Sequence, residues 1–336
     1  MKILLVARVD LSLPGGVETH VHSLAASLRA KGDDVTVWDR AACAAAEREA
    51  NPGSLDAYDI VHHHAGPWLR GTPVPPGYVR TFHFSVASKM RTYLMRRRLR
   101  TLANPGNWAA LREERGALRR RGSFIAVSPG LKRDLVRFHH VDPDRMHVIS
   151  NGGCFDTPRE GRAAWRARHG LDEATPVLLT IGRRDYVKGL DLLERAWRRR
   201  PASLANAVWV AVGASDGPPV PGRVGTGSIP LSDVIEWIYA ADLGAFPSYY
   251  EGGGIALLDM LAAGLYTLTH DVGIASEVVR SGRNGEILDP RAEAWREALA
   301  RLLVHPAHPG RPGLGPEYRW DRVADRVTMV YRERSP

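Results

Sequence analysis

The sequence predicts an α/β protein with two parallel β-sheets, each covered by helices on both faces. Short apolar runs with the length of buried strands alternate with longer segments that have helical spacing, and this alternation is typical of parallel sheets. The alternation occurs in two sets. The chain has 336 residues, of which 44% are hydrophobic, so it is long enough for two domains with separate cores.

The predicted elements follow in order along the chain. The first set of strands covers residues 3–7, 35–38, 60–63, 79–83, 124–127 and 146–149. The second set covers residues 177–182, 208–212, 224–226, 243–247 and 266–269. Residues 161–170 predict a polar helix outside both cores, residues 320–332 predict a terminal helix, and residues 306–316, rich in Gly and Pro, predict a loop.

Composition limits the class of protein. The two cysteines, Cys43 and Cys154, form neither a disulfide framework nor a metal-binding spacing, which favours a reducing compartment. No apolar run is long enough to span a bilayer, and the apolar run at residues 1–7 is too short for a signal peptide. We therefore expect a soluble globular protein of the cytoplasm.

A basic loop follows the first strand of the second set. It contains Arg183 and Lys188 and precedes a helix predicted at residues 190–199. Open α/β sheets bind ligands at the carboxyl ends of their strands, where this loop lies. Two cations at this place can neutralise the roughly two negative charges of a diphosphate.

A second motif places two acids, Glu251 and Asp259, eight residues apart across a glycine-rich helix start. The glycines and the first residue of the helix are Gly252, Gly253, Gly254 and Ile255. Glycines let the backbone approach a ligand, and a helix N-terminus favours an anion. Carboxylates accept hydrogen bonds from sugar hydroxyls, so two acids can hold two sugars. The two motifs together predict a site for a sugar joined to a nucleotide diphosphate.

These residues resemble the retaining glycosyltransferases of the GT4 family, whose signature is a G-R-x4-K-G loop followed by E-x7-E. The resemblance implies that Arg183 and Lys188 bind the donor diphosphate. It implies that Glu251 contacts the transferred sugar and that Asp259 binds the ribose. Asp259 departs from the family pattern, because aspartate is one methylene shorter than the usual glutamate.

The resemblance extends in order over nearly the whole chain. Gly15 and Gly16, after the first strand, are similar to the family's glycine loop, and His83 is similar to a histidine on its active face. Further matching segments are 124–128, 148–152 and 271–290.

The resemblance implies the GT-B fold, in which two Rossmann-like domains face each other across a cleft. Residues 1–155 would form the N-terminal, acceptor-side domain, and residues 156–316 the C-terminal domain that binds the nucleotide sugar. Residues 317–336 would hold a C-terminal helix that crosses back to pack on the N-terminal domain.

The activity implied is transfer of a hexose-type sugar, with retention, from a nucleotide diphosphate sugar to a hydroxyl acceptor. A UDP-sugar or GDP-sugar is the favoured donor; glycolipid, polysaccharide and natural-product acceptors all fit. The predicted catalytic residues are His83, Glu251, Arg183 and Lys188. The predicted donor-binding residues are Gly15, Gly16, Arg183, Lys188, Glu251, Gly252, Gly253, Gly254, Ile255 and Asp259.

No cofactor and no metal are expected. No Asp-x-Asp motif lies at a strand end in the right setting, which suits an enzyme that replaces the metal with arginine, lysine and helix amides. The triplet His62, His63 and His64 follows a strand, but no cluster of Cys, Asp or Glu at metal spacing accompanies it.

Residues 89–121 carry a dense basic run that only Glu113 and Glu114 oppose. Its cations are Lys89, Arg91, Arg96, Arg97, Arg98, Arg100, Arg112, Arg115, Arg119, Arg120 and Arg121. Interleaved apolar residues are Met90, Tyr93, Leu94, Leu99 and Trp108. Such a face has two interpretations: it rests on anionic lipid, or it is simply a solvated surface. In the first case the protein would be peripheral to a membrane and close to a lipid-linked acceptor. No nucleic-acid-binding module is recognisable.

Three other functions stay open. A nucleotide-sugar epimerase of GT-B fold would bind the same donor, and Asp259 in place of glutamate would suit an inactive binding subunit. A dehydrogenase is disfavoured, because no Gly-x-Gly-x-x-Gly motif follows the first strand.

Overall fold

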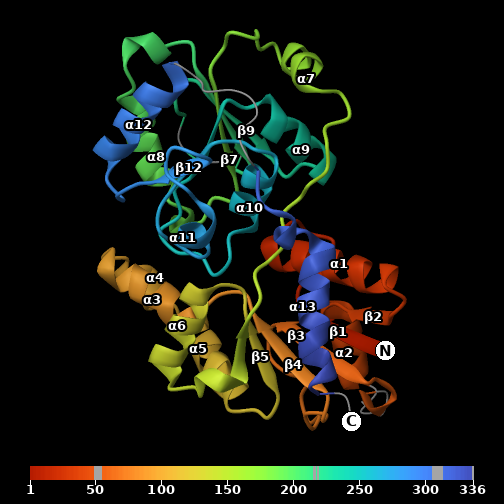
Figure 1. Cartoon of the computed structure of the whole chain (residues 1–336). Helices are drawn as coiled ribbons and strands as arrows, with labels where there is room; N and C mark the ends of the chain where they lie inside the picture. The colour runs from red at the N-terminus through yellow and green to blue at the C-terminus, as the bar shows by residue number, and fades with distance from the viewer. Residues whose placement is uncertain (49–54, 215–216, 218, 305–312, 335–336) are drawn as a thin grey trace. The chain divides into compact units, whose positions relative to one another are not determined.

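The computed structural model describes residues 1–48, 55–214, 217, 219–304 and 313–334. The chain divides into two compact units (Figure 1). The N-terminal unit comprises Met1–Gly152 together with Glu317–Pro336, and the C-terminal unit comprises Gly153–Pro316. Each unit holds one six-stranded parallel sheet, which confirms the predicted α/β class.

The sheet of the N-terminal unit has the strand order β2-β1-β3-β4-β5-β6. Its strands are β1 (Lys2–Ala7), β2 (Asp34–Trp38), β3 (Ile60–Ala65), β4 (Tyr78–Phe82), β5 (Ser123–Ala126) and β6 (Met146–Val148). The central strand β1 is buried from its second residue onward and pairs Ile3 with Val35 on one side and with Ile60 on the other. Strands buried on both faces are continuous apolar runs in the sequence, and for this reason they could be predicted.

Helices cover this sheet on both faces. They are α1 (Gly16–Ala30), α2 (Arg40–Arg48), α3 (Val86–Met95), α4 (Leu99–Leu102), α5 (Pro105–Leu118), α6 (Pro129–His139) and α13 (Trp320–Arg332). The last of these, α13, lies beside α1 (Figure 1). Val323, Val327 and Val330 are spaced to share one face of α13, and that face joins the core around Leu24 and Leu28 of α1. The last helix of the chain thus returns to the first sheet, as the predicted fold requires.

The sheet of the C-terminal unit has the order β12-β11-β10-β7-β8-β9. Its strands are β7 (Val177–Ile181), β8 (Val208–Val212), β9 (Arg223–Gly227), β10 (Leu243–Phe246), β11 (Thr267–Thr269) and β12 (Gly285–Ile287). Its helices are α7 (Arg162–Arg168), α8 (Leu190–Arg198), α9 (Leu231–Ala240), α10 (Ile255–Ala262), α11 (Ala275–Val278) and α12 (Ala292–Val304). Trp197, Trp209 and Trp295 are fully buried in the core of this unit.

The position of α7 differs from the sequence-based prediction of a helix outside both cores. Trp165 is only 3% exposed and packs edge-on against Trp237 of α9, with ring centroids 5.8 Å apart. Arg166 is also buried, and its guanidinium donates to the carbonyls of Ala240 and Asp172. Backbone carbonyls satisfy the buried cation, so Trp165 and Arg166 of this polar segment are buried while the rest of α7 stays at the surface.

Two further predictions concern a loop of this unit and membrane-spanning helices in the chain as a whole. Most of the predicted loop at residues 306–316 lies outside the described residues. Within the described part of the chain, no helix is both long and apolar enough to cross a membrane.

Candidate active site

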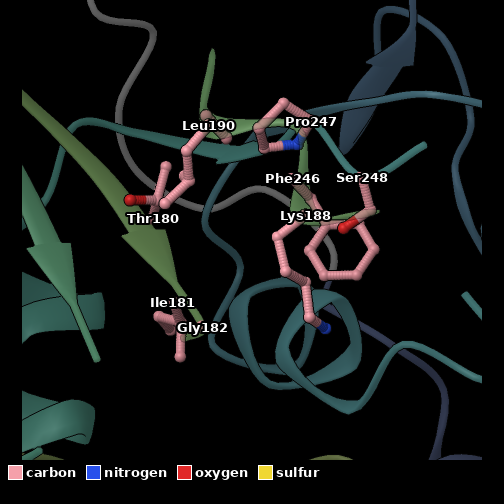
Figure 2. A pocket seen from close by; sticks show the side chains of 9 residues that line it. Thr180, Ile181, Gly182, Lys188, Leu190, Phe246, Pro247 and Ser248 are labelled. Carbon is pink, nitrogen blue, oxygen red and sulfur yellow. The ribbon is translucent and has the colours of Figure 1, made fainter. Parts of the chain in front are cut away.

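The carboxyl ends of β7 and β10, which are neighbours in the sheet, border a small pocket in the C-terminal unit (Figure 2). The residues that line it are Thr180, Ile181, Gly182, Lys188, Leu190, Ala245, Phe246, Pro247 and Ser248. The pocket therefore lies where a parallel sheet is expected to bind a ligand, and one of the predicted site residues, Lys188, forms part of its wall.

The loop that carries Lys188 is fixed by a close approach to β10. Asp185 caps a short 3-10 turn by accepting from the N–H of Val187. Gly189 ends the turn with φ of 67°, and a Cβ added there would lie 1.9 Å from the carbonyl oxygen of Pro247. Only glycine fits this left-handed and crowded position. The backbone N–H of Tyr249 also donates to the Val187 carbonyl at 2.7 Å, which ties the two loops together.

Lys188 and Glu251, from the two separate motifs, meet in this unit. The Lys188 Nζ lies 2.7 Å from the Glu251 Oε1, and the Ser248 hydroxyl donates to the same oxygen at 2.7 Å. The Lys188 side chain runs beside the ring of Phe246, with its Nζ 5.9 Å from the ring centroid (Figure 2). An ammonium has three donors, so Lys188 keeps two for a ligand while Glu251 holds it in position.

The two adjacent arginines of the loop have different environments. Arg184 makes an ion pair with Glu194 of α8 at 2.7 Å. Arg183 is exposed, and among the residues that the structure describes no hydrogen bond or ion pair engages its guanidinium. Of the two arginines, Arg183 is therefore the one available to an anionic ligand.

The predicted glycine segment forms the entry to α10. Gly252, Gly253 and Gly254 are buried, and Gly254 occupies the N-cap position of α10 with φ of 93°. No side chain caps this helix, which begins at Ile255. An uncapped helix N-terminus has unpaired backbone N–H groups and a partial positive charge, both of which favour an anion.

Asp259 has a hydrogen-bond partner outside the Lys188–Glu251 pair. Its Oδ1 accepts a hydrogen bond of 2.8 Å from the backbone N–H of Cys154, at the start of the C-terminal unit. The side chain is 9% exposed, and burial raises the pKa of its carboxyl to about 7. In the described residues, no hydrogen bond links Asp259 to the residues that line the pocket. The contact that the structure does show for Asp259 is an anchor for the chain entering the unit.

The remaining predicted residues, Gly15, Gly16 and His83, lie in the N-terminal unit. Gly15 and Gly16 stand at the start of α1, and open space surrounds the position where a Cβ would stand on Gly16. His83 follows β4, with its Nε2 3.4 Å from the Nδ1 of His64. Burial lowers the pKa of the His83 imidazole well below its usual value of 6.5, so the ring is neutral at pH 7.

Two residues of this site escaped the sequence-based prediction. Ser248 donates to Glu251, and Phe246 lies beside Lys188. Both lie at the end of β10, just before Glu251, and their position after a buried strand was the signal that could have identified them.

Two family models match the chain. The model described as "Glycosyl transferases group 1" matches residues 175–305, and the model described as "Glycosyltransferase Family 4" matches residues 54–152. Together they cover more than half of the chain, and they include the loop of Lys188 and the segment of Glu251 in one case and His83 in the other.

Relatives and solved structures agree with these matches. A D-inositol 3-phosphate glycosyltransferase of Xylanimonas cellulosilytica is 27% identical over 311 residues, covering 82% of this chain and 72% of the relative. The sucrose-phosphate synthase from Thermosynechococcus elongatus superposes with a TM-score of 0.77 and 19% identity, over 99% of both chains. HepE from Anabaena, solved in complex with UDP-glucose, superposes with a TM-score of 0.67 and 15% identity over 100% of this chain and 96% of its own. These structures show the GT-B fold.

Proposed function

Because this chain belongs to the GT4-like glycosyltransferases, we propose that it transfers a hexose-type sugar, with retention, from a nucleotide diphosphate sugar to a hydroxyl acceptor. The observation that carries the proposal is the meeting of Lys188 and Glu251, 63 residues apart in sequence, at the strand ends of the C-terminal unit. A cation for the diphosphate and a carboxylate for the sugar are thereby placed next to each other.

In this proposal the donor diphosphate binds Lys188, the free guanidinium of Arg183 and the uncapped N-terminus of α10. These groups would stabilise the negative charge that develops on the leaving diphosphate, so that no metal ion is required there. A uridine nucleotide is our first choice of donor, because the related fold of HepE was solved with UDP-glucose; a guanosine nucleotide is the second.

Glu251 has a defined part in this proposal. Its Oε1 is occupied by Lys188 and Ser248, whereas none of the described residues donates a hydrogen bond to its Oε2. The free oxygen would accept a hydrogen bond from a hydroxyl of the transferred sugar. The carboxylate would thus fix both the cation and the sugar, which sets the position of the anomeric carbon relative to the diphosphate.

The proposed reaction proceeds at the front face of the donor sugar. The bond between the anomeric carbon and the diphosphate oxygen breaks, and the acceptor oxygen bonds to that carbon from the same side. The acceptor proton passes to the departing phosphate oxygen. We assign His83 to the positioning of the donor sugar, for which a neutral imidazole offers one donor and one acceptor.

The remaining predicted donor residues have smaller parts. Asp259 would offer the ribose the oxygen that Cys154 does not occupy. Gly15 and Gly16 would let the backbone of the N-terminal unit approach the ligand.

The acceptor side of the proposal rests on the helices α3 to α5. The two acids that oppose the basic run are engaged within the unit: Glu113 pairs with Arg80 and Arg120, and the buried Glu114 accepts from the backbone N–H of Val86. Exposed apolar side chains accompany the arginines, namely Phe84, Leu94, Met95, Leu99 and Trp108. Met90 and Tyr93 are buried in the unit and do not belong to this face.

Such a face, basic with protruding apolar side chains, suits an anionic lipid surface and hence a lipid-linked acceptor. Sedimentation with vesicles tests this part of the proposal. Binding to vesicles that contain anionic lipid, but not to neutral vesicles, is expected, and a Leu99→Asp/Trp108→Asp variant should lose it; equal recovery of both proteins with anionic vesicles would refute it.

The activity itself is tested by incubating the protein with UDP-sugars and GDP-sugars and measuring the nucleotide released. Release of one nucleotide diphosphate, unaffected by EDTA and lost in a Lys188→Ala variant, is the expected result. Conversion of the donor to an isomer without release would instead identify an epimerase. Tight binding with neither release nor conversion would identify a binding subunit.

A further inference from the structure

Three histidines that are distant in sequence lie together in the N-terminal unit. His20 comes from α1, His64 from β3, and His83 from the segment directly after β4. One ring nitrogen of each residue lies within 4.8 Å of those of the other two. The ring centroid of His20 is 4.7 Å from that of His83 and 5.1 Å from that of His64. Helix α1, strand β3 and the segment after β4 thus each contribute one histidine to the cluster.

His20 presents an unpaired nitrogen to this cluster. Its Nδ1 lies 2.8 Å from the side-chain oxygen of Asn151. An amide oxygen can only accept, so the His20 Nδ1 carries the proton and the Nε2 carries a lone pair. The side chain is 2% exposed, and its Nε2 has no hydrogen-bond partner among the described residues. A histidine that is oriented through one nitrogen and unpaired at the other is typical of a metal ligand.

His64 and His83 supply the other two nitrogens. The His64 Nδ1 and the His83 Nε2 are 3.4 Å apart, which is long for a hydrogen bond. It is about the separation of two nitrogens that share a tetrahedral ion at roughly 2.0–2.1 Å from each.

The neighbouring histidines of β3 do not share these features. His62 is bonded through both ring nitrogens, to the hydroxyls of Tyr331 and Thr81. His63 contacts the Tyr78 hydroxyl and the Ala65 carbonyl in the same way. Only one member of the triplet is therefore available as a ligand, and its companions come from other elements.

We propose that His20, His64 and His83 bind a divalent transition-metal ion of the Zn²⁺ class. Imidazole nitrogens suit zinc, copper, nickel and cobalt ions, and three such ligands leave a fourth position open for water. Three nitrogens that share one ion at roughly 2.0–2.1 Å from each lie closer together than 4.8 Å, so rotation of the side chains toward one another would complete the site. His83 is only partly buried and gives the ion a route from solvent.

This site lies in the N-terminal unit, whereas Lys188 and Glu251 lie in the C-terminal unit. It shares His83 with the donor-sugar contact proposed above: with an ion on its Nε2, this imidazole keeps its Nδ1–H for the sugar.

The test uses the whole chain, without a histidine tag, after treatment with a chelator and its removal. Co²⁺ is added as a spectroscopic substitute for Zn²⁺, and binding is followed by visible absorption and then by displacement with Zn²⁺. One equivalent of Co²⁺ is expected to bind, with the absorption of a four-coordinate ion. His20→Gln and His83→Gln should each weaken binding at least about tenfold.

His22→Gln is the matched control, because His22 lies on the same helix and bonds the Leu11 carbonyl instead. It should bind Co²⁺ like the parent protein. His83→Gln decides the matter if His20→Gln does not fold, because His83 is partly exposed; near-ultraviolet circular dichroism verifies its fold. Absence of saturable Co²⁺ binding, or equal affinities for the His83→Gln and His22→Gln proteins, would overturn the proposal.

Discussion

The ammonium of Lys188 lies 2.7 Å from the carboxylate of Glu251, although 63 residues separate them in the chain. The strand order of the sheet produces this contact, because β7 and β10 are neighbours and both residues follow the carboxyl ends of those strands. The cation and the acid to which we assign the diphosphate and the transferred sugar are therefore positioned by the same sheet edge.

Replacement of Lys188 by alanine should abolish most turnover and leave the fold intact. Lys188 is 31% exposed at its side chain, so its removal disturbs little packing. Loss of one donor to a developing oxyanion typically lowers the rate about 10²–10³-fold. Lys188→Arg is the conservative comparison, since it keeps the charge. A Lys188→Ala protein with near-normal turnover would refute the assignment.

The two arginines of the loop should separate binding from stability. Arg183→Ala removes a free cation and should weaken UDP binding about tenfold or more without changing the melting temperature. Arg184→Ala breaks a partly exposed ion pair, while Glu194 keeps Arg223 at 2.7 Å. It should lower stability by at most about 0.5–1 kcal/mol and leave UDP affinity unchanged. Calorimetry of both variants measures their UDP affinity and their melting temperature. If Arg184→Ala weakened UDP binding while Arg183→Ala lowered the melting temperature, the roles assigned to the two arginines would be exchanged.

Gly189→Ala should destabilise the protein far more than Gly170→Ala. Both glycines have φ of 67°, so the strain of the left-handed backbone is the same, at about 1 kcal/mol. A Cβ at Gly189 would collide with the Pro247 carbonyl at 1.9 Å, whereas nothing lies within 4 Å of one at Gly170. The additional loss at Gly189 should be at least about 1–3 kcal/mol in chemical denaturation. Equal losses of stability in the two variants would show that the loop at Gly189 does not closely approach the Pro247 carbonyl after β10.

Asp259→Asn should stabilise the protein increasingly as the pH rises from 5 to 8. Burial raises the pKa of Asp259 to about 7, from a usual value of 3.8. Between these values the unfolded chain releases the proton and the folded chain keeps it, so the folded state loses stability as pH rises through this window. At pH values above 7, the free energy of unfolding is lower by roughly 4 kcal/mol than it is at acid pH.

Asparagine cannot ionise and still accepts from the N–H of Cys154, so the difference in melting temperature between the two proteins should widen with pH. A difference that stays constant from pH 5 to pH 8 would contradict the account. UDP affinity, measured on the same samples, reports separately on the proposed ribose contact.

Much of the fold could be predicted because buried parallel strands are continuous apolar runs. β12 was missed, because two of its three residues, Gly285–Ile287, are glycine and glutamate, so it forms no apolar run.

The candidate site could be predicted where it depends on local motifs and not where it depends on tertiary contacts. Arg183, Lys188 and Glu251 lie in loops after strands and were recognisable from their spacing. The hydrogen bond between Asp259 and Cys154 joins residues 105 positions apart, so no local sequence pattern predicts it. The cluster of His20, His64 and His83 likewise depends on tertiary contacts. The sequence drew attention to the triplet His62, His63 and His64 and, separately, to His83, but gave no sign that His20 joins two of them.

The most direct test of the central claim is a calorimetric titration of the EDTA-treated protein and of its Lys188→Ala variant with UDP and with GDP. We predict that one of the two nucleotides binds the parent protein without added metal, and that the variant binds it at least about tenfold more weakly. Binding that requires a divalent ion, or that is unchanged in the variant, would contradict a diphosphate site built from Arg183, Lys188 and the N-terminus of α10.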